Sequence, residues 1–177
     1  MNIRVFSQEF LIKLMSHKGT VKQWFSNPEK VAFIRISSSG LNDFPIEFPD
    51  ENIAIFDFPD WEEEEYLKNK EDLERQADRI EDIMGIRPRY LPISDEEAKE
   101  IVKFVLSMKE KRIETLYVHC DAGKSRSPSV AYAVAKYILE DEQLTEYFDM
   151  PFYNLNQTVI KKIKKAYRGK NNDNKEK

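Results

Sequence analysis

One stretch of nine residues, 119–127, constrains this chain more than any other. It reads His-Cys-Asp-Ala-Gly-Lys-Ser-Arg-Ser and joins an apolar run, residues 115–118, to a helix-like run, residues 129–139. A strand, a tight loop of small residues and a helix N-terminus together present backbone N–H groups to an oxyanion. The sequence therefore predicts an anion-binding loop between a strand and a helix.

Two side chains of this loop suit phosphoryl chemistry. Cys120 is the candidate nucleophile, because helix N-termini and cationic neighbours favour the thiolate that attacks phosphorus. Five residues later, Arg126 offers a guanidinium that binds two phosphate oxygens and spreads the charge of the transition state. Gly123 allows the backbone to approach a ligand closely or to take a positive φ. These residues predict attack on a phosphate monoester, a phosphocysteine intermediate and its hydrolysis by water.

Two other interpretations of the loop explain fewer of its residues. Gly123-Lys124-Ser125 resembles the end of a nucleotide-binding P-loop, but that motif needs a glycine five positions before Gly123, where Val118 stands. A buried structural cysteine at a strand end is common, yet it would not require the arginine and glycine as well. The phosphate-binding interpretation is therefore preferred.

The loop resembles the signature loop of the cysteine-dependent protein phosphatases, the protein-tyrosine and dual-specificity group. That resemblance implies that His119 orders the loop through hydrogen bonds and that Ser127 stabilises the departing thiolate when phosphocysteine is hydrolysed. The side chain of Asp121 is expected to point outward, because its charge would oppose that of phosphate. The residues expected to surround the bound phosphate are Asp121, Ala122, Gly123, Lys124, Ser125 and Arg126.

The resemblance also implies a general acid on a separate mobile loop that precedes the nucleophile. Asp60 is the first candidate, since Phe58-Pro59-Asp60 follows a predicted strand and looks like the aromatic-Pro-Asp loop of these enzymes. Asp57, at the strand end, is the second candidate. Asp95 is the third, although a helix-capping role would explain it adequately. The distance of 60 residues between Asp60 and Cys120 is longer than small dual-specificity enzymes usually have.

Strands alternating with helices predict a three-layer α/β fold with a mostly parallel central sheet of four to five strands. The predicted strands are residues 3–6, 31–36, 53–56 and 115–118. Helices are expected at 7–15, 62–84, 94–108, 127–139 and 155–167, with Gly85 ending the second and a capping box at Ser94 starting the third. A single domain, 1–168, is expected, followed by a disordered tail, 169–177.

The predicted helix over residues 62–84 looks like an insertion directly after the acid loop. Residues 60–82 hold eleven acidic and four basic side chains. Either a packed structural helix or a lid or wall that selects substrates would fit this pattern. Residues 161–170 hold six basic side chains and no acidic one, which is typical of a solvated helix face.

Composition limits the setting of the protein. One cysteine excludes an intrachain disulfide and favours a cytoplasmic location. The N-terminus lacks a signal-peptide pattern, and no apolar run approaches membrane-spanning length. Nucleic acid is not expected as a partner, because no basic patch carries interleaved aromatic residues. The predicted chemistry requires neither a metal nor an organic cofactor.

A phosphorylated protein, with phosphotyrosine first, is the expected substrate. A phosphoinositide phosphatase is an alternative, but such enzymes often carry two lysines in the loop, whereas here Asp121 replaces one and Lys124 is the one that remains. An RNA 5′-phosphate phosphatase of the same fold is a second alternative. The third is a phosphate-binding module without catalysis, which the combination of Cys120, Arg126 and Ser127 disfavours.

Overall fold

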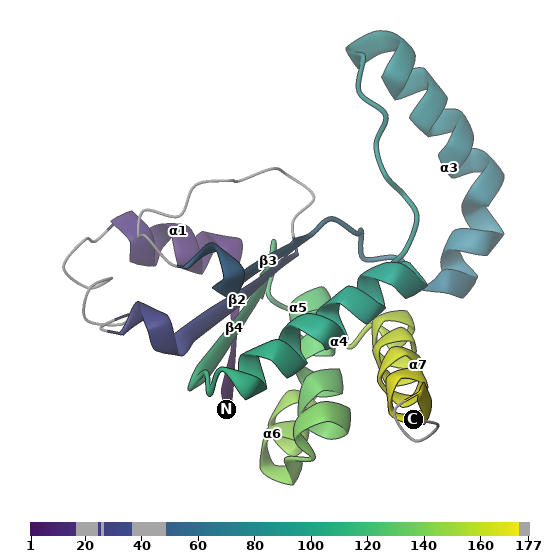
Figure 1. The fold of residues 1–177 in the computed structure, drawn as a ribbon. Coiled ribbons are helices and arrows are strands. Elements are labelled where there is room, and N and C mark those ends of the chain that lie inside the picture. The colour runs from purple at the N-terminus through teal and green to yellow at the C-terminus, as the bar shows by residue number, and fades with distance from the viewer. Residues whose placement is uncertain (17–24, 26, 37–48, 174–177) are drawn as a thin grey trace.

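The computed structural model describes residues 1–16, 25, 27–36 and 49–173. Its centre is a sheet of four strands, β1 (Asn2–Ser7), β2 (Val31–Ile36), β3 (Ile53–Phe56) and β4 (Thr115–Cys120). The strands lie in the order β1-β4-β2-β3 and every neighbouring pair is parallel (Figure 1). The predicted α/β fold with a parallel sheet is thus confirmed, and the sheet of the described residues is entirely parallel.

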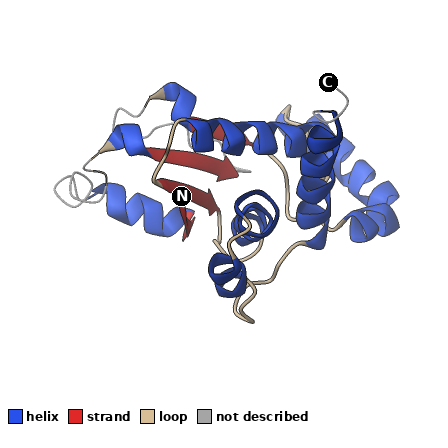
Figure 2. Cartoon of the chain, turned by 60° about the horizontal axis from the view of Figure 1, so that its bottom comes forward, coloured by secondary structure: helices blue, strands red, loops and turns tan. Residues whose placement is uncertain are grey.

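Helices surround this sheet (Figure 2). They are α1 (Gln8–Ser16), α3 (Glu63–Met84), α4 (Asp95–Glu110), α5 (Arg126–Ala133), the π-helical segment η3 (Val134–Leu139), α6 (Glu142–Phe148) and α7 (Gln157–Asp173). Two single 3₁₀ turns, η1 (Pro28–Lys30) and η2 (Asp50–Asn52), lead into β2 and β3. The parallel arrangement follows from the helical crossovers that such strands require.

The strand β2 shows why the sheet is buried on both faces. Its residues alternate between two clusters, so that Ile34 and Ile36 pack with the main core of α4, α5 and α7, while Val31 and Phe33 pack with Phe25 and Tyr117 on the other face. A strand that is buried at every position and apolar at all but one, Arg35, is typical of a strand covered on both sides. On the second face, Phe10 of α1 packs against Phe6 with its ring tilted and the ring centroids 4.9 Å apart.

Two predicted helix starts are seen in the hydrogen bonds. Ser7 Oγ accepts from the backbone N–H of Phe10 at 3.1 Å, at the start of α1. Ser94 and Glu97 form a reciprocal capping box at the start of α4. Each bond satisfies a helix N–H that has no partner within the helix.

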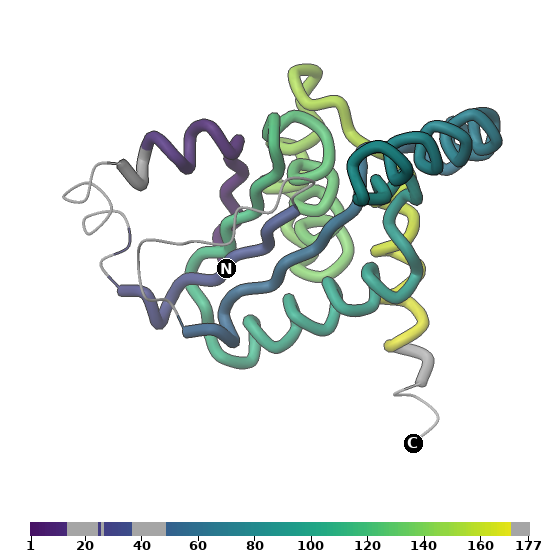
Figure 3. The backbone as a smooth tube through the Cα atoms, turned by 90° about the horizontal axis from the view of Figure 1, so that it is seen from above, coloured from purple at the N-terminus to yellow at the C-terminus, as the bar shows by residue number. Residues whose placement is uncertain are grey.

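Helix α3 and the segment that returns from it extend away from the body of the molecule (Figure 3). The helix ends at Gly85, whose φ of 67° is favourable for glycine and whose N–H donates to Glu81 O. Arg87 then ties the returning segment to α3, through ion pairs to Glu74 at 2.8 Å, Asp78 at 2.5 Å and Glu81 at 2.9 Å. The predicted insertion is therefore a helix packed against its own return segment.

Three parts of the chain differ from the predicted elements. The helix that follows the cysteine loop is continued by the π-helical η3, and α6, residues 142–148, was not predicted. The last helix, α7, runs past Gly169, where the predicted tail began, as far as Asp173. A Cβ at Gly169 would meet no atom within 4 Å, so this glycine lies in an open stretch of helix. Residues 174–177, at the end of the predicted tail, lie outside the described part of the chain.

Candidate active site

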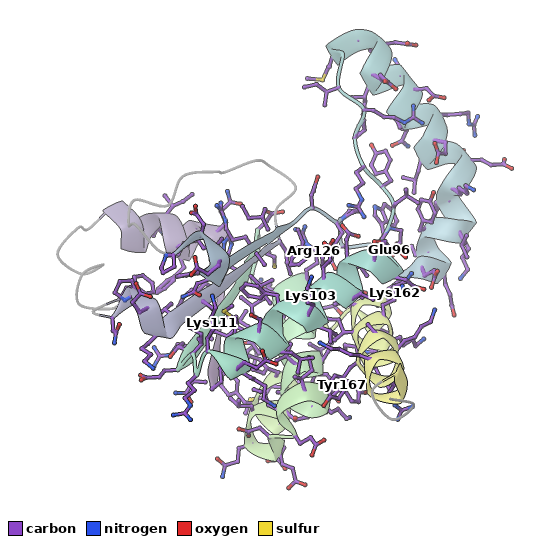
Figure 4. The ribbon with its side chains drawn as sticks, viewed as in Figure 1. Glu96, Lys103, Lys111, Arg126, Lys162 and Tyr167 are labelled. Atoms are coloured by element: carbon purple, nitrogen blue, oxygen red, sulfur yellow. The ribbon has the colours of Figure 1, made fainter. Side chains whose placement is uncertain are left out.

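The cysteine loop joins β4 to α5 as the sequence predicts. Cys120 is the last residue of β4 and Arg126, labelled in Figure 4, is the first residue of α5. Cys120 is 2% exposed, and its Sγ lies 3.1 Å from the Oγ of Ser127, in the first turn of the helix. Between Cys120 and Arg126, Ala122 and Lys124 are exposed, Asp121 and Gly123 are half-buried, and Ser125 is buried.

Gly123 is the residue that lets this loop pass beneath the β1–α1 junction. Its φ is +68°, and a Cβ added there would lie 2.7 Å from the backbone nitrogen of Ser7 and 2.9 Å from the carbonyl carbon of Phe6. Both contacts are with backbone atoms, which cannot move aside as a side chain could. The N–H of Gln8 also donates to Asp121 O at 3.1 Å, which fastens the loop to α1. The expected need for glycine at this position therefore has a steric cause, the close approach of the backbone of Phe6 and Ser7.

Arg126 has two hydrogen-bond partners within the protein. Its Nη1 donates to the carbonyl oxygen of Phe58 at 3.0 Å, and its Nη2 pairs with Asp121 Oδ2 at 2.5 Å. The expectation that Asp121 points outward is therefore wrong. Because a guanidinium that is only 9% exposed is costly to bury without an anionic partner, the nearest carboxylate of the loop turns towards it.

The three general-acid candidates have different surroundings. Asp60 Oδ1 accepts from Ser125 Oγ at 2.7 Å, so its carboxylate touches the cysteine loop. Asp57 is exposed, and its backbone carbonyl accepts from Arg89. Asp95 pairs with Lys165 at 2.7 Å and with Lys162 at 3.3 Å, at the start of α4. Among the carboxylates of these three, the structure brings that of Asp60 to the loop.

His119 is buried and precedes Cys120 in β4, so its side chain lies on the opposite face of the sheet. Burial and, to a lesser extent, the neighbouring charge of Arg35 lower the pKa of His119 to about 4, although the charge of Asp121 opposes this shift. Arg35 is the residue of β2 that lies in register with His119 of β4. The imidazole is therefore neutral at physiological pH, with one nitrogen that donates and one that accepts.

This burial predicts a dependence of stability on pH. Between pH 6.5 and about 4 the unfolded chain protonates His119 but the folded chain does not, so the unfolded state binds more protons and stability falls as pH falls. The difference between the two pKa values of His119 corresponds to about 3 kcal/mol in the free energy of unfolding. Urea unfolding of the wild type and of His119→Gln, at several pH values, measures it. The advantage of the wild type should shrink by about that amount from pH 7 to pH 4, and a difference independent of pH would contradict the prediction.

The contact between Cys120 and Ser127 predicts the effect of removing the hydroxyl. If the reaction passes through a phosphocysteine, Ser127→Ala should slow breakdown of this intermediate more than its formation, because the hydroxyl is placed to stabilise the thiolate that would depart in the second step. Rapid-quench kinetics should show a larger burst and accumulation of the intermediate. Equal slowing of both steps, without accumulation, would remove Ser127 from this role.

Two residues near the loop were not singled out in the sequence. Asn156, just before α7, donates through Nδ2 to Asp60 Oδ1 at 3.1 Å. Ser129 Oγ donates to Ser125 O at 2.6 Å and accepts from the N–H of Asn156 at 2.7 Å. An asparagine before an amphipathic run is a helix-start pattern that could have identified Asn156 as a cap. Its contact with the acid loop depends on tertiary structure.

The described residues contain no cluster of three or more His, Cys, Asp or Glu side chains that could hold a metal ion. Within the same part of the chain, no helix is long and apolar enough to span a membrane.

Comparison with known proteins identifies relatives in structure. No protein-family model and no curated protein matches the sequence. The crystal structure of the PTP-2 phosphatase of Cydia pomonella matches with a TM-score of 0.51 at 15% identity, covering 93% of this chain and 85% of that one. PTPMT1 matches with a TM-score of 0.48 at 11% identity, covering 99% and 96% of the two chains. The chain therefore shares the α/β fold of the PTP-2 phosphatase of Cydia pomonella.

Proposed function

We propose that this chain is a phosphomonoester hydrolase that acts through a phosphocysteine intermediate. The observation that carries the proposal is the convergence of Cys120, Arg126 and Asp60 on one loop at a helix N-terminus. Cys120 ends the strand, Arg126 begins the helix and Asp60 lies on the acid loop, yet all three suit one reaction. A phosphatase-like fold without these side chains would give no reason to expect catalysis.

The first step transfers the phosphoryl group to sulfur. The Cys120 thiolate attacks phosphorus, the bond from phosphorus to the ester oxygen breaks, and Asp60 gives a proton to the departing oxygen. Arg126 binds the equatorial oxygens of the phosphoryl group. Phosphate competes with Asp121 for this guanidinium, while the carbonyl of Phe58 continues to hold its other side.

The second step releases phosphate. Water attacks phosphorus, Asp60 takes a proton from that water, and the bond between phosphorus and sulfur breaks. Ser127 Oγ, 3.1 Å from Cys120 Sγ, donates a hydrogen bond to the thiolate that leaves. Both steps balance without an oxidant, a reductant or a metal ion.

A phosphorylated protein, with phosphotyrosine first, is the proposed substrate class. The carboxylate of Asp121 beside Arg126 supports this choice, because it adds a negative charge where enzymes of highly charged phosphoinositides place lysine. The test is hydrolysis of a phosphotyrosine peptide, a phosphoserine peptide and a soluble phosphoinositide, each with and without a chelator. Hydrolysis of the phosphotyrosine peptide at the highest kcat/KM, unaffected by chelator, is expected. Preference for the phosphoinositide would overturn the substrate class, and absence of turnover on all three would overturn the function.

A further inference from the structure

The acid loop is fastened to the N-terminus of α7. Glu62 accepts from the backbone N–H groups of Gln157 at 2.6 Å and Thr158 at 2.9 Å, using one carboxylate oxygen for each. The Thr158 hydroxyl donates to Glu62 at 2.8 Å and accepts from the N–H of Glu63 at 2.8 Å. These bonds satisfy helix N–H groups that would otherwise lack partners, and the carboxylate lies at the positive end of the helix dipole. Residues 62–63 are thereby held at a fixed place.

Asn156 extends this attachment to Asp60. It is 4% exposed, and its Oδ1 accepts from the N–H of Val159 at 3.1 Å, the bond of a helix N-cap. Because Oδ1 faces the helix, Nδ2 must face the acid loop, where it donates to Asp60 Oδ1 at 3.1 Å and to Trp61 O at 3.3 Å. The cap therefore fixes which way the amide is turned.

Asp60 receives two hydrogen bonds on the same oxygen. Ser125 Oγ donates to Oδ1 at 2.7 Å from the cysteine loop, and Asn156 Nδ2 donates to it from α7. An oxygen that accepts two such bonds is a poor place for a proton, because the proton would displace a donor. The proton of the acid is therefore carried on Oδ2, and the carboxyl group cannot rotate without breaking both bonds.

We infer that Asn156 is a positioning residue for the general acid, which it holds on the cysteine loop with Oδ2 directed to the leaving oxygen. This inference rests on the proposed function, since it assigns a task to Asn156 in that reaction. Asn156 acts through its hydrogen bond to Asp60 and does not itself bind the phosphoryl group. Its loss should weaken protonation of the leaving group while attack by Cys120 remains.

The variant that tests this is Asn156→Ser. Serine keeps a side-chain oxygen for the N-cap of α7 but is too short to donate to Asp60 as the amide does. Rates on a series of aryl phosphates should fall little for acidic leaving groups and about 10–100-fold for the most basic ones. Asp141→Ser is the matched control: Asp141 Oδ1 caps α6 by accepting from the N–H of Leu144 at 2.9 Å. It should leave the rates unchanged for every leaving group.

Two further variants keep the test decisive. On an Asp60→Asn background, Asn156→Ser should add no further dependence on the leaving group, because the group that it positions is already absent. Asn156→Asp keeps the cap but places a second carboxylate beside Asp60. Its negative charge favours the protonated form of the acid, so the pH above which activity is lost should rise. This shift is a readout that a purely structural role would not produce.

Three outcomes overturn the inference. A uniform loss for all leaving groups in Asn156→Ser, or a fully additive loss on the Asp60→Asn background, would make Asn156 structural only. An unshifted pH profile in folded Asn156→Asp would do the same. If Asp60→Asn itself shows no dependence on the leaving group, the assignment of the acid fails together with the inference. If Asp60→Asn shows that dependence and Asn156→Ser does not, the inference fails and the proposed function stands.

Discussion

We expect Cys120→Ser to abolish turnover while leaving the protein folded. The serine hydroxyl is smaller than the thiol and fits the buried position, but it is not ionised at neutral pH and is a much weaker nucleophile. The expected activity is below about 1% of wild type, which corresponds to at least about 2.7 kcal/mol in the activation barrier. Initial rates on p-nitrophenyl phosphate measure the loss, and thermal unfolding monitors the fold.

Anion binding by the same variant separates chemistry from recognition. Phosphate or vanadate should still bind at the N-terminus of α5, since Arg126 and the backbone of the loop are unchanged. A folded Cys120→Ser protein with activity above about 1% of wild type would exclude the thiolate mechanism. An anion found only elsewhere in a soaked crystal would count against the loop as the phosphate site.

We expect Asp60→Asn to reduce turnover by about 10²–10³, in the range typical of a general acid. Asparagine keeps the size of the side chain and can still accept from Ser125 and Asn156, but it carries no proton for the leaving oxygen. The loss should be large for alkyl phosphates, whose leaving groups need the proton. It should be much smaller for phosphates with acidic leaving groups. A kcat series against leaving-group acidity measures this difference.

The other acid candidates provide matched controls for that series. Asp57→Asn should lack the dependence on leaving group, because Asp57 contacts Arg89 through its backbone carbonyl and its carboxylate makes no hydrogen bond to the cysteine loop among the described contacts. Asp95→Asn should also lack it and should lower stability slightly, since the Asp95 carboxylate pairs with Lys162 and Lys165. The same modest loss on every substrate for Asp60→Asn would show that Asp60 is not the acid.

The parts of the structure that the sequence predicts best are those with local causes. The strand β2 is an apolar run interrupted by Arg35 alone, and the capping box at Ser94 is a pattern of side chains three residues apart. The connection from Cys120 to Arg126 was likewise predictable, because a strand, a small-residue loop and a helix start follow one another in sequence. Each of these features is determined by neighbouring residues and needs no information about the tertiary structure.

The features that the sequence did not reveal depend on long-range contacts. Asn156 and Asp60 are 96 residues apart, and a helix cap gives no indication of which loop it meets. The pairing of Asp121 with Arg126 depends on how deeply the guanidinium is buried, which neither residue determines by itself. The order of the strands also required the structure, since the alternation of strands and helices is compatible with several parallel sheets.

The most direct test of the account is the identity of the covalent intermediate. Wild-type enzyme mixed with excess aryl phosphate and quenched with acid in the burst phase should carry one phosphoryl group, and peptide mass spectrometry should locate it on Cys120. Ser127→Ala should carry more of it under the same conditions. A phosphoryl group on another residue, or an enzyme that turns over without any covalent phosphate on Cys120 in either protein, would contradict the phosphocysteine mechanism.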